Sequence, residues 1–250
     1  MGFRAELRPP CVSARLPAAD RLYSYVRPGA WLPLQPVPHF VIKVSESMSS
    51  AAKVPGTQLN PQLAELVAQF AAVKAEASEL VHGLKESQFN WRPAPHRWSM
   101  AECLLHLNIV GDRYVRLLEK AIEQTAARGR VGRGPFAYGF LGQRLLARTE
   151  PPPKRKRRAP RSFTPAYGQP ITAVLPTFRH IQEQLALLLE QTNGLDIGSI
   201  KVRAPGLGPM RLNLYVTFAW IAAHERRHLW QARQVRNHPK FPAQQGGRVG

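Results

Sequence analysis

The chain is poor in cysteine and has no long apolar run. Only two of its 250 residues are cysteine, Cys11 and Cys103, and they fit no CxxC spacing of a metal or redox site. So few cysteines favour a reduced, cytoplasmic protein over a disulfide-stabilised one. No stretch of 18 or more apolar residues occurs, so we expect no membrane span and no membrane partner.

Acidic residues are also scarce: the chain has 16 Asp and Glu and 35 Lys and Arg, for a net charge of +19. Much of the excess is local, because residues 128–161 hold eleven basic residues and one acidic residue. The run PPPKRKRRAPR (151–161) repels itself and is flanked by prolines, which favours a solvated loop. Weak electrostatic contact with nucleic acid is the alternative, but we expect no dedicated nucleic-acid partner.

Four segments carry apolar residues at helical spacing, and they predict helices over 60–86, 99–127, 170–192 and 211–236. Asn60-Pro61 is typical of a helix start, and Ser99 with Glu102 forms a capping-box pattern. Asn193-Gly194 is typical of a helix end. Residues 134–148 favour a further short helix, and no strand pattern competes. The predicted fold class is therefore all-α.

The arrangement of these segments predicts a four-helix bundle with a long crossover between helices 2 and 3. About 40 residues, 128–169, join these two helices, which is enough for a basic loop insertion that lets them run parallel. We assign the bundle to residues 48–238. Residues 1–47 are proline-rich and aperiodic, which favours a disordered arm, with Met48 as an alternative start; residues 239–250 are expected to be a flexible tail.

The stretch AHERRHLWQ contains His224 and His228, four residues apart on a strongly apolar helix. This spacing places two imidazoles on one helix face, where they can bind one metal ion. The pattern also matches the HExxH motif of zinc peptidases, but no Asp or Glu follows Glu225 to supply their further ligand. The peptidase interpretation is therefore rejected, and Glu225 is expected to be a surface partner of the neighbouring arginines.

The third ligand must then lie upstream, and His106 in CLLHLNIV is the best candidate because it lies on an apolar helix stripe. A satisfied core histidine is the alternative for this residue. Three imidazoles would suit Zn²⁺ or Ni²⁺. Other side chains near the predicted ligand faces, which are candidates to orient the ligands or contact a substrate, are Gln231, Asn108 and Asp112. Cys103 is read as a core residue, with a thiol ligand as the alternative.

Two segments resemble the DinB-like superfamily: FNWRPAPHRWSMAECLLHLN (89–108) and VTFAWIAAHERRHLWQARQV (216–235). The resemblance implies a four-helix bundle with a crossover and a metal site formed by His106, His224 and His228. It also implies a metal-dependent transferase or hydrolase acting on a small substrate, which can be a thiol such as bacillithiol or mycothiol. His96 and the long basic insertion depart from the family pattern. A non-catalytic bundle that binds metal or a partner is the alternative, and a homodimer stays open.

Overall fold

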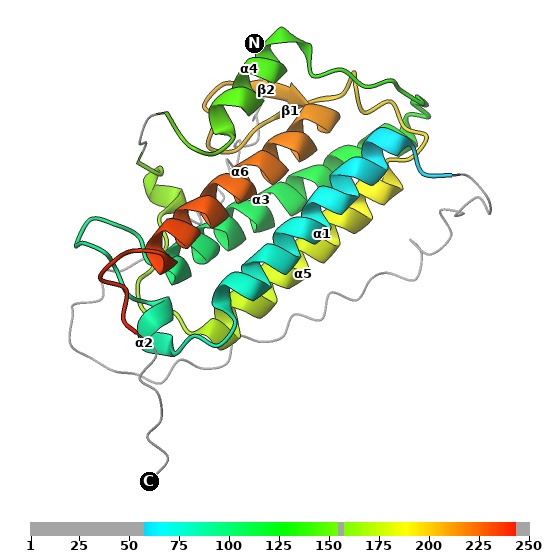
Figure 1. Ribbon diagram of the computed structural model, residues 1–250. Coiled ribbons are helices and arrows are strands. Elements are labelled where there is room, and N and C mark those ends of the chain that lie inside the picture. Colours follow the sequence, from blue (N-terminus) through cyan, green and yellow to red (C-terminus); the bar gives the residue numbers. More distant parts are fainter. Residues whose placement is uncertain (1–57, 155–157, 244–250) are drawn as a thin grey trace, which may run out of the picture. The chain divides into compact units, whose positions relative to one another are not determined.

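The computed structural model describes residues 58–154 and 158–243 (Figure 1). Every described residue belongs to one compact unit of the chain, Gly56–Gly250. The arm expected over residues 1–47 and the alternative start at Met48 lie outside the described residues.

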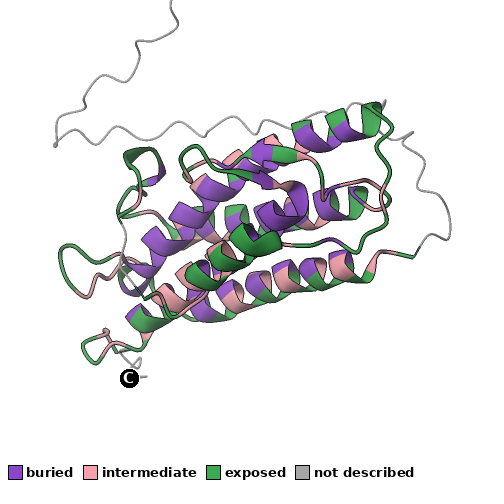
Figure 2. Cartoon of the chain, turned by 90° about the horizontal axis from the view of Figure 1, so that it is seen from above, coloured by how far each residue is buried: buried purple, intermediate pink, exposed green. Residues whose placement is uncertain are grey.

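Four long helices form the body of this unit: α1 (Pro61–Val81), α3 (Met100–Ala127), α5 (Ile171–Gln191) and α6 (Leu214–Arg236). Helices α1 and α3 each contact both α5 and α6, so the four helices form a closed ring around the buried interior. Buried residues follow the facing sides of these helices, while the outer sides are exposed (Figure 2). The prediction of an all-α, four-helix bundle is confirmed.

The direction of each helix follows from the residues that share a core. One cluster joins the first halves of α1 and α6 to the second halves of α3 and α5, and includes Leu63, Leu118, Leu185 and Phe218. The other cluster joins the opposite halves, and includes Ala77, Leu104, Phe178 and Leu229. Helices α3 and α5 are therefore parallel to each other and antiparallel to α1 and α6, as the long crossover predicts.

Side-chain caps explain where the helices begin. The Asn60 side chain accepts a hydrogen bond of 2.8 Å from the backbone N–H of Gln62. Ser99 and Glu102 cap one another's backbone N–H groups, as the sequence pattern predicts. Asn213 caps α6, because its side chain accepts a 2.7 Å bond from Val216 N. These bonds satisfy donors that the first turn of a helix leaves unpaired.

Two predicted boundaries are wrong. The first helix ends at Val81 rather than at 86, because the chain turns at Gly83 with a φ of 72° and then forms α2 (Glu86–Phe89). The fourth helix begins at Leu214 rather than at 211. Residues Arg211–Asn213 instead form strand β2, which pairs antiparallel with β1 (Lys201–Arg203). Strands of three residues are too short to show an alternating pattern.

The crossover contains structure of its own. Helix α4 (Gly139–Thr149) corresponds approximately to the short helix expected over 134–148. It packs on α6, where Gly142 of α4 lies against Val216. Glu150 follows α4 and pairs with Arg226 of α6. A single 3₁₀ turn, η2 (Arg161–Phe163), then lies on α3 before α5 begins.

The first residues of the expected C-terminal tail pack on the turn region after α1. The ring of Phe241 meets that of Trp91 edge-on at a centroid distance of 5.6 Å. The carbonyl of Pro242 accepts a 2.9 Å hydrogen bond from Gln88 Nε2. Residues 244–250 lie outside the described residues.

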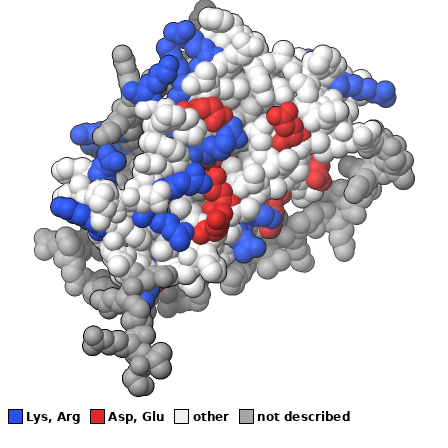
Figure 3. All heavy atoms as spheres, in the orientation of Figure 1, with Lys and Arg blue, Asp and Glu red and all other residues white. Residues whose placement is uncertain are grey.

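Charged side chains of both signs alternate on the face formed by α1 and α6, whereas Lys and Arg gather near α4 (Figure 3). The alternation includes the pair Arg233–Glu76, at 2.6 Å, and the pair Arg226–Glu150. Within the described ranges, no helix is both long and apolar enough to cross a membrane.

Candidate metal centre

Three histidines from two antiparallel helices meet inside the bundle. His106 comes from α3, and His224 and His228 come from successive turns of α6. One ring nitrogen from each lies within 4.8 Å of the other two, which is the spacing of a group that can hold a metal ion. Their ring centroids are 4.6 to 5.4 Å apart. We refer to these three residues as the histidine cluster.

The tautomer of His106 is set by a backbone carbonyl of the crossover. His106 is only 4% exposed, and its Nδ1 lies 2.7 Å from the carbonyl oxygen of Phe163. A carbonyl oxygen can only accept, so Nδ1 must carry the proton and donate it. The other ring nitrogen, Nε2, then keeps its lone pair and can serve as a metal ligand.

The other two histidines each carry a buried nitrogen with no hydrogen-bond partner among the described residues. These atoms are Nδ1 of His224 and Nδ1 of His228. Burying an imidazole with an unpaired polar nitrogen is unfavourable, and such atoms are uncommon in folded proteins. A metal ion held by the cluster would account for placing these two imidazoles side by side.

The environment keeps all three imidazoles neutral. Burial lowers the pKa of His106, against a smaller opposing effect of its bond to Phe163. Burial, followed by the nearby His106 and Arg227, lowers the pKa of His224 to about 3. Burial and the neighbouring histidines also hold the pKa of His228 well below its ordinary value, although a hydrogen bond with Gln231 opposes this. Neutral imidazole is the form that binds metal.

Aromatic side chains enclose the histidine cluster. The ring of Trp98 lies 5.0 Å from that of His106 and 5.8 Å from that of His228. Trp220 stacks on His224 at 4.8 Å with an interplanar angle of 18°. Because Trp220 precedes His224 by four residues on one helix, the helical pattern could have identified it.

Two surface hollows lie away from the histidine cluster. One is lined by residues near the C-terminal ends of α1 and α6, including His82 and Arg236. Another lies along α5 around His180. The candidate centre is located by its converging ring nitrogens.

The other expected site residues are placed differently. Gln231 hydrogen-bonds to His228 through its side chain. Asn108 is buried but donates to the Val174 carbonyl at 2.9 Å, which ties α3 to α5. Asp112 is not brought to the cluster, because its exposed carboxylate pairs with Arg116 at 2.9 Å. Cys103 is a free, fully buried core thiol whose pKa is raised by burial, so it is not poised as a thiolate.

The expectation that Glu225 is a surface residue is wrong. Its carboxyl group is 2% exposed, and Oε1 accepts a 2.8 Å hydrogen bond from Gln182 Nε2 on α5. Helix α6 is contacted by α1, α3 and α4, so a side chain about 100° around the axis from His224 still faces the interior. Burial raises the pKa of Glu225 to about 8.

A family model described as the DinB superfamily matches residues 69–232, a range that contains all three histidines. No curated protein and no solved structure match the chain.

Proposed function

Because the chain belongs to the DinB superfamily, we propose that it binds one divalent metal ion through His106, His224 and His228 and uses it to activate a small substrate. The family and the histidine cluster together fit a metal-binding protein. The observation that carries the proposal is the convergence of three neutral imidazoles, two of which have a buried nitrogen without a partner among the described residues.

The ligand set favours an open site over a closed structural one. Three neutral imidazoles leave the full charge of Zn²⁺ or Ni²⁺ uncompensated, and such an ion can lower the pKa of a water or thiol that it binds. The chain's own residues prepare this site. The Phe163 carbonyl fixes the proton of His106, while Trp98 and Trp220 cover the imidazoles and limit access of water. This chemistry supports a transferase or hydrolase, with a thiol among the substrates to be tested.

A non-catalytic metal-binding bundle is the second candidate. The observation that favours it is the packing of Trp98 and Trp220 directly against the histidine rings. Chelator-sensitive turnover of a thiol with an electrophile, or of a hydrolysable ester, would favour the enzyme. A full equivalent of metal without such turnover would favour the second candidate.

The test of the metal centre is metal content, measured by elemental analysis on protein purified without a histidine tag. Wild type should carry one equivalent, and His106→Ala and His228→Ala should both lose it, because each supplies one of three ligands. Glu225→Gln is the matched control, since it changes a buried residue of the same helix without changing a ligand. If His106→Ala keeps a full equivalent while His228→Ala loses it, the three-histidine centre is wrong.

A further inference from the structure

The crossover supplies the hydrogen bond that orients one proposed ligand, and an arginine of α3 contacts that part of the crossover. Resting on the proposed metal centre, we infer that Arg113 is a positioning residue for His106. It fixes η2 on α3, so that the carbonyl of Phe163 keeps the proton of His106 on Nδ1 and leaves Nε2 available to the metal.

Arg113 contacts two successive residues of η2, Ser162 and Phe163. It follows His106 by seven residues on α3, which places both side chains on the same helix face. Its Nη2 donates a 2.7 Å hydrogen bond to the carbonyl of Ser162. Its guanidinium carbon lies 4.1 Å from the centroid of the Phe163 ring, in cation–π geometry. The guanidinium thus contacts the backbone of one residue and the side chain of the next.

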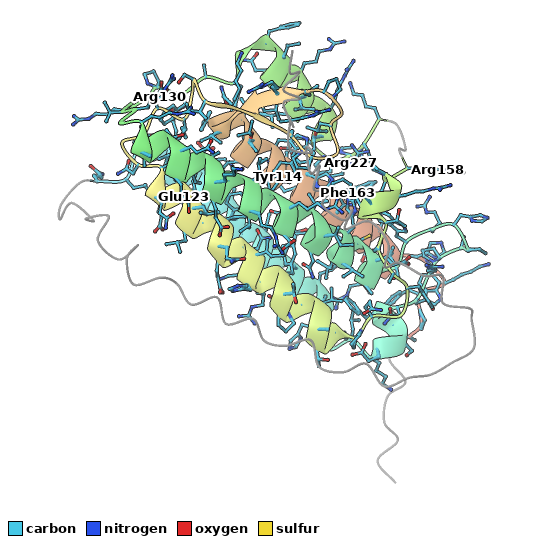
Figure 4. The ribbon with its side chains drawn as sticks, turned by 180° about the vertical axis from the view of Figure 1, so that it is seen from behind. Tyr114, Glu123, Arg130, Arg158, Phe163 and Arg227 are labelled. Carbon is cyan, nitrogen blue, oxygen red and sulfur yellow. The ribbon has the colours of Figure 1, made fainter. Side chains whose placement is uncertain are left out.

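Phe163 also contacts the turn between β1 and β2 through its side chain. Its ring approaches Gly206, in the turn between β1 and β2, so closely that an added Cβ there would lie 3.3 Å from a ring carbon. Tyr114, the residue after Arg113, donates a 3.0 Å hydrogen bond to the neighbouring Pro205 carbonyl. In Figure 4, where Tyr114 and Phe163 are labelled, the turn that carries Phe163 lies beside α3.

The remaining backbone bonds of η2 are local. Phe163 N donates to Pro160 O, and Thr164 N donates to Arg161 O. These bonds maintain the shape of the turn, but they do not fix where the turn lies on α3. Among the described residues, the polar contacts between η2 and α3 besides the His106 bond itself come from Arg113. Loss of Arg113 should therefore loosen the Phe163 carbonyl while leaving the bundle folded.

A loosened carbonyl has a defined chemical consequence. Without a fixed acceptor at Nδ1, neutral imidazole can move its proton to Nε2, and a protonated nitrogen cannot bind a metal. Hydrogen-bond partners of metal-binding histidines are typically worth 10- to 100-fold in metal affinity. Because the carbonyl itself remains in an Arg113 variant, we expect a loss of about tenfold, at the lower end of that range.

The sign of the effect separates positioning from simple electrostatics. Arg113 is a positive charge near a proposed divalent cation site, and like charges repel. If charge were its only role, Arg113→Ala would leave metal affinity unchanged or raise it. Weaker binding in this variant therefore requires the positioning role.

The experiment compares Arg113→Ala with Arg116→Ala, a matched control that removes the same charge one turn later. Arg116 pairs with Asp112, and its side chain is 75% exposed. Zn²⁺ affinity is measured by competition with a chromophoric chelator. Arg113→Ala should bind about tenfold more weakly than wild type, Arg116→Ala should match wild type, and Arg113→Lys should lie between, because lysine keeps the charge but not the planar stacking group.

A second measurement addresses the proton itself. Side-chain ¹⁵N chemical shifts of His106 in the metal-free protein should show the Nδ1–H tautomer in wild type and Arg116→Ala, and a tautomer mixture in Arg113→Ala. Should Arg113→Ala fail to fold, Phe163→Leu supplies the test, because it removes the stacked ring and keeps the carbonyl.

Unchanged Zn²⁺ affinity together with an unchanged tautomer in the folded variant would overturn the inference. An equal loss of affinity in Arg116→Ala would do the same, because that residue does not contact η2. Failure of the proposed metal centre looks different: wild type itself would bind no Zn²⁺, and the tautomer measurement would still decide whether Arg113 positions His106.

Discussion

Adding one methyl group at Gly111 should destabilise the fold, because Gly111 of α3 lies directly against Ile181 of α5. A Cβ on Gly111 would lie 2.6 Å from Cγ2 of Ile181, far inside van der Waals contact. Ile181 is 4% exposed, and its β-branched side chain has few rotamers in a helix. Overpacking costs about 1–3 kcal/mol, and the better helix propensity of alanine offsets about 1 kcal/mol. Gly111→Ala should therefore lose up to about 2 kcal/mol of unfolding free energy.

Two changes at Ile181 test the cause. Ile181→Leu removes the branch that carries Cγ2, whereas Ile181→Val keeps Cγ2 and removes only Cδ1. Urea denaturation of each single and double variant gives the coupling energy with Gly111→Ala. Leucine should rescue most of the loss, and valine should rescue little. Equal rescue by both, or a Gly111→Ala variant as stable as wild type, would refute the proposed clash.

Two further predictions concern the crossover and the buried carboxyl group. Replacing KRKRR (154–158) with a Gly/Ser linker should leave the Tm nearly unchanged, because Lys154 and Arg158 are exposed. A loss of several kcal/mol of unfolding free energy would show that this run packs against the rest of the protein. Burial raises the pKa of Glu225 from 4.5 to about 8, so the folded chain binds this proton more tightly than the unfolded chain, and stability from this group is lost as pH rises through that range. In chelator-treated protein, Glu225→Gln should therefore gain stability relative to wild type between pH 5 and 8, by up to about 1.4 kcal/mol per pH unit; a difference that does not change with pH in urea denaturation would show that the group is already ionised.

The four long helices could be predicted from the sequence because each carries its signal locally. Ser99 and Glu102 lie three residues apart, and their reciprocal bonds form as the pattern predicts. The start of α6 could not be predicted in the same way. Strands β1 and β2 have three residues each, and their turn depends on Gly206 and Gly208 at positive φ, so the segment has no period to detect.

The candidate site also has parts that local sequence patterns predict and parts that they do not. The pairing of His224 with His228 follows from helix geometry, and His106 follows from an apolar stripe. The partner of His106 does not, because a backbone carbonyl is common to all residues and Phe163 lies 57 residues away. The expectation that Glu225 lies on the surface is wrong because helical spacing shows which way a side chain points on its own helix. It does not show how many neighbouring helices surround that helix.

The parallel arrangement of α3 and α5 has a consequence for how the chain folds. Among the four long helices, the pairs that pack most extensively are α1 with α5, α1 with α6, α3 with α5 and α3 with α6. None of these pairs consists of two consecutive helices that pack antiparallel across a short turn. A short connection therefore cannot bring any of these pairs together. Each pairing must wait for distant parts of the chain to meet, and mean sequence separation of contacts slows folding. We therefore expect this bundle to fold more slowly than an up-and-down bundle of the same length, with the histidine cluster assembled only after α6 has joined α3.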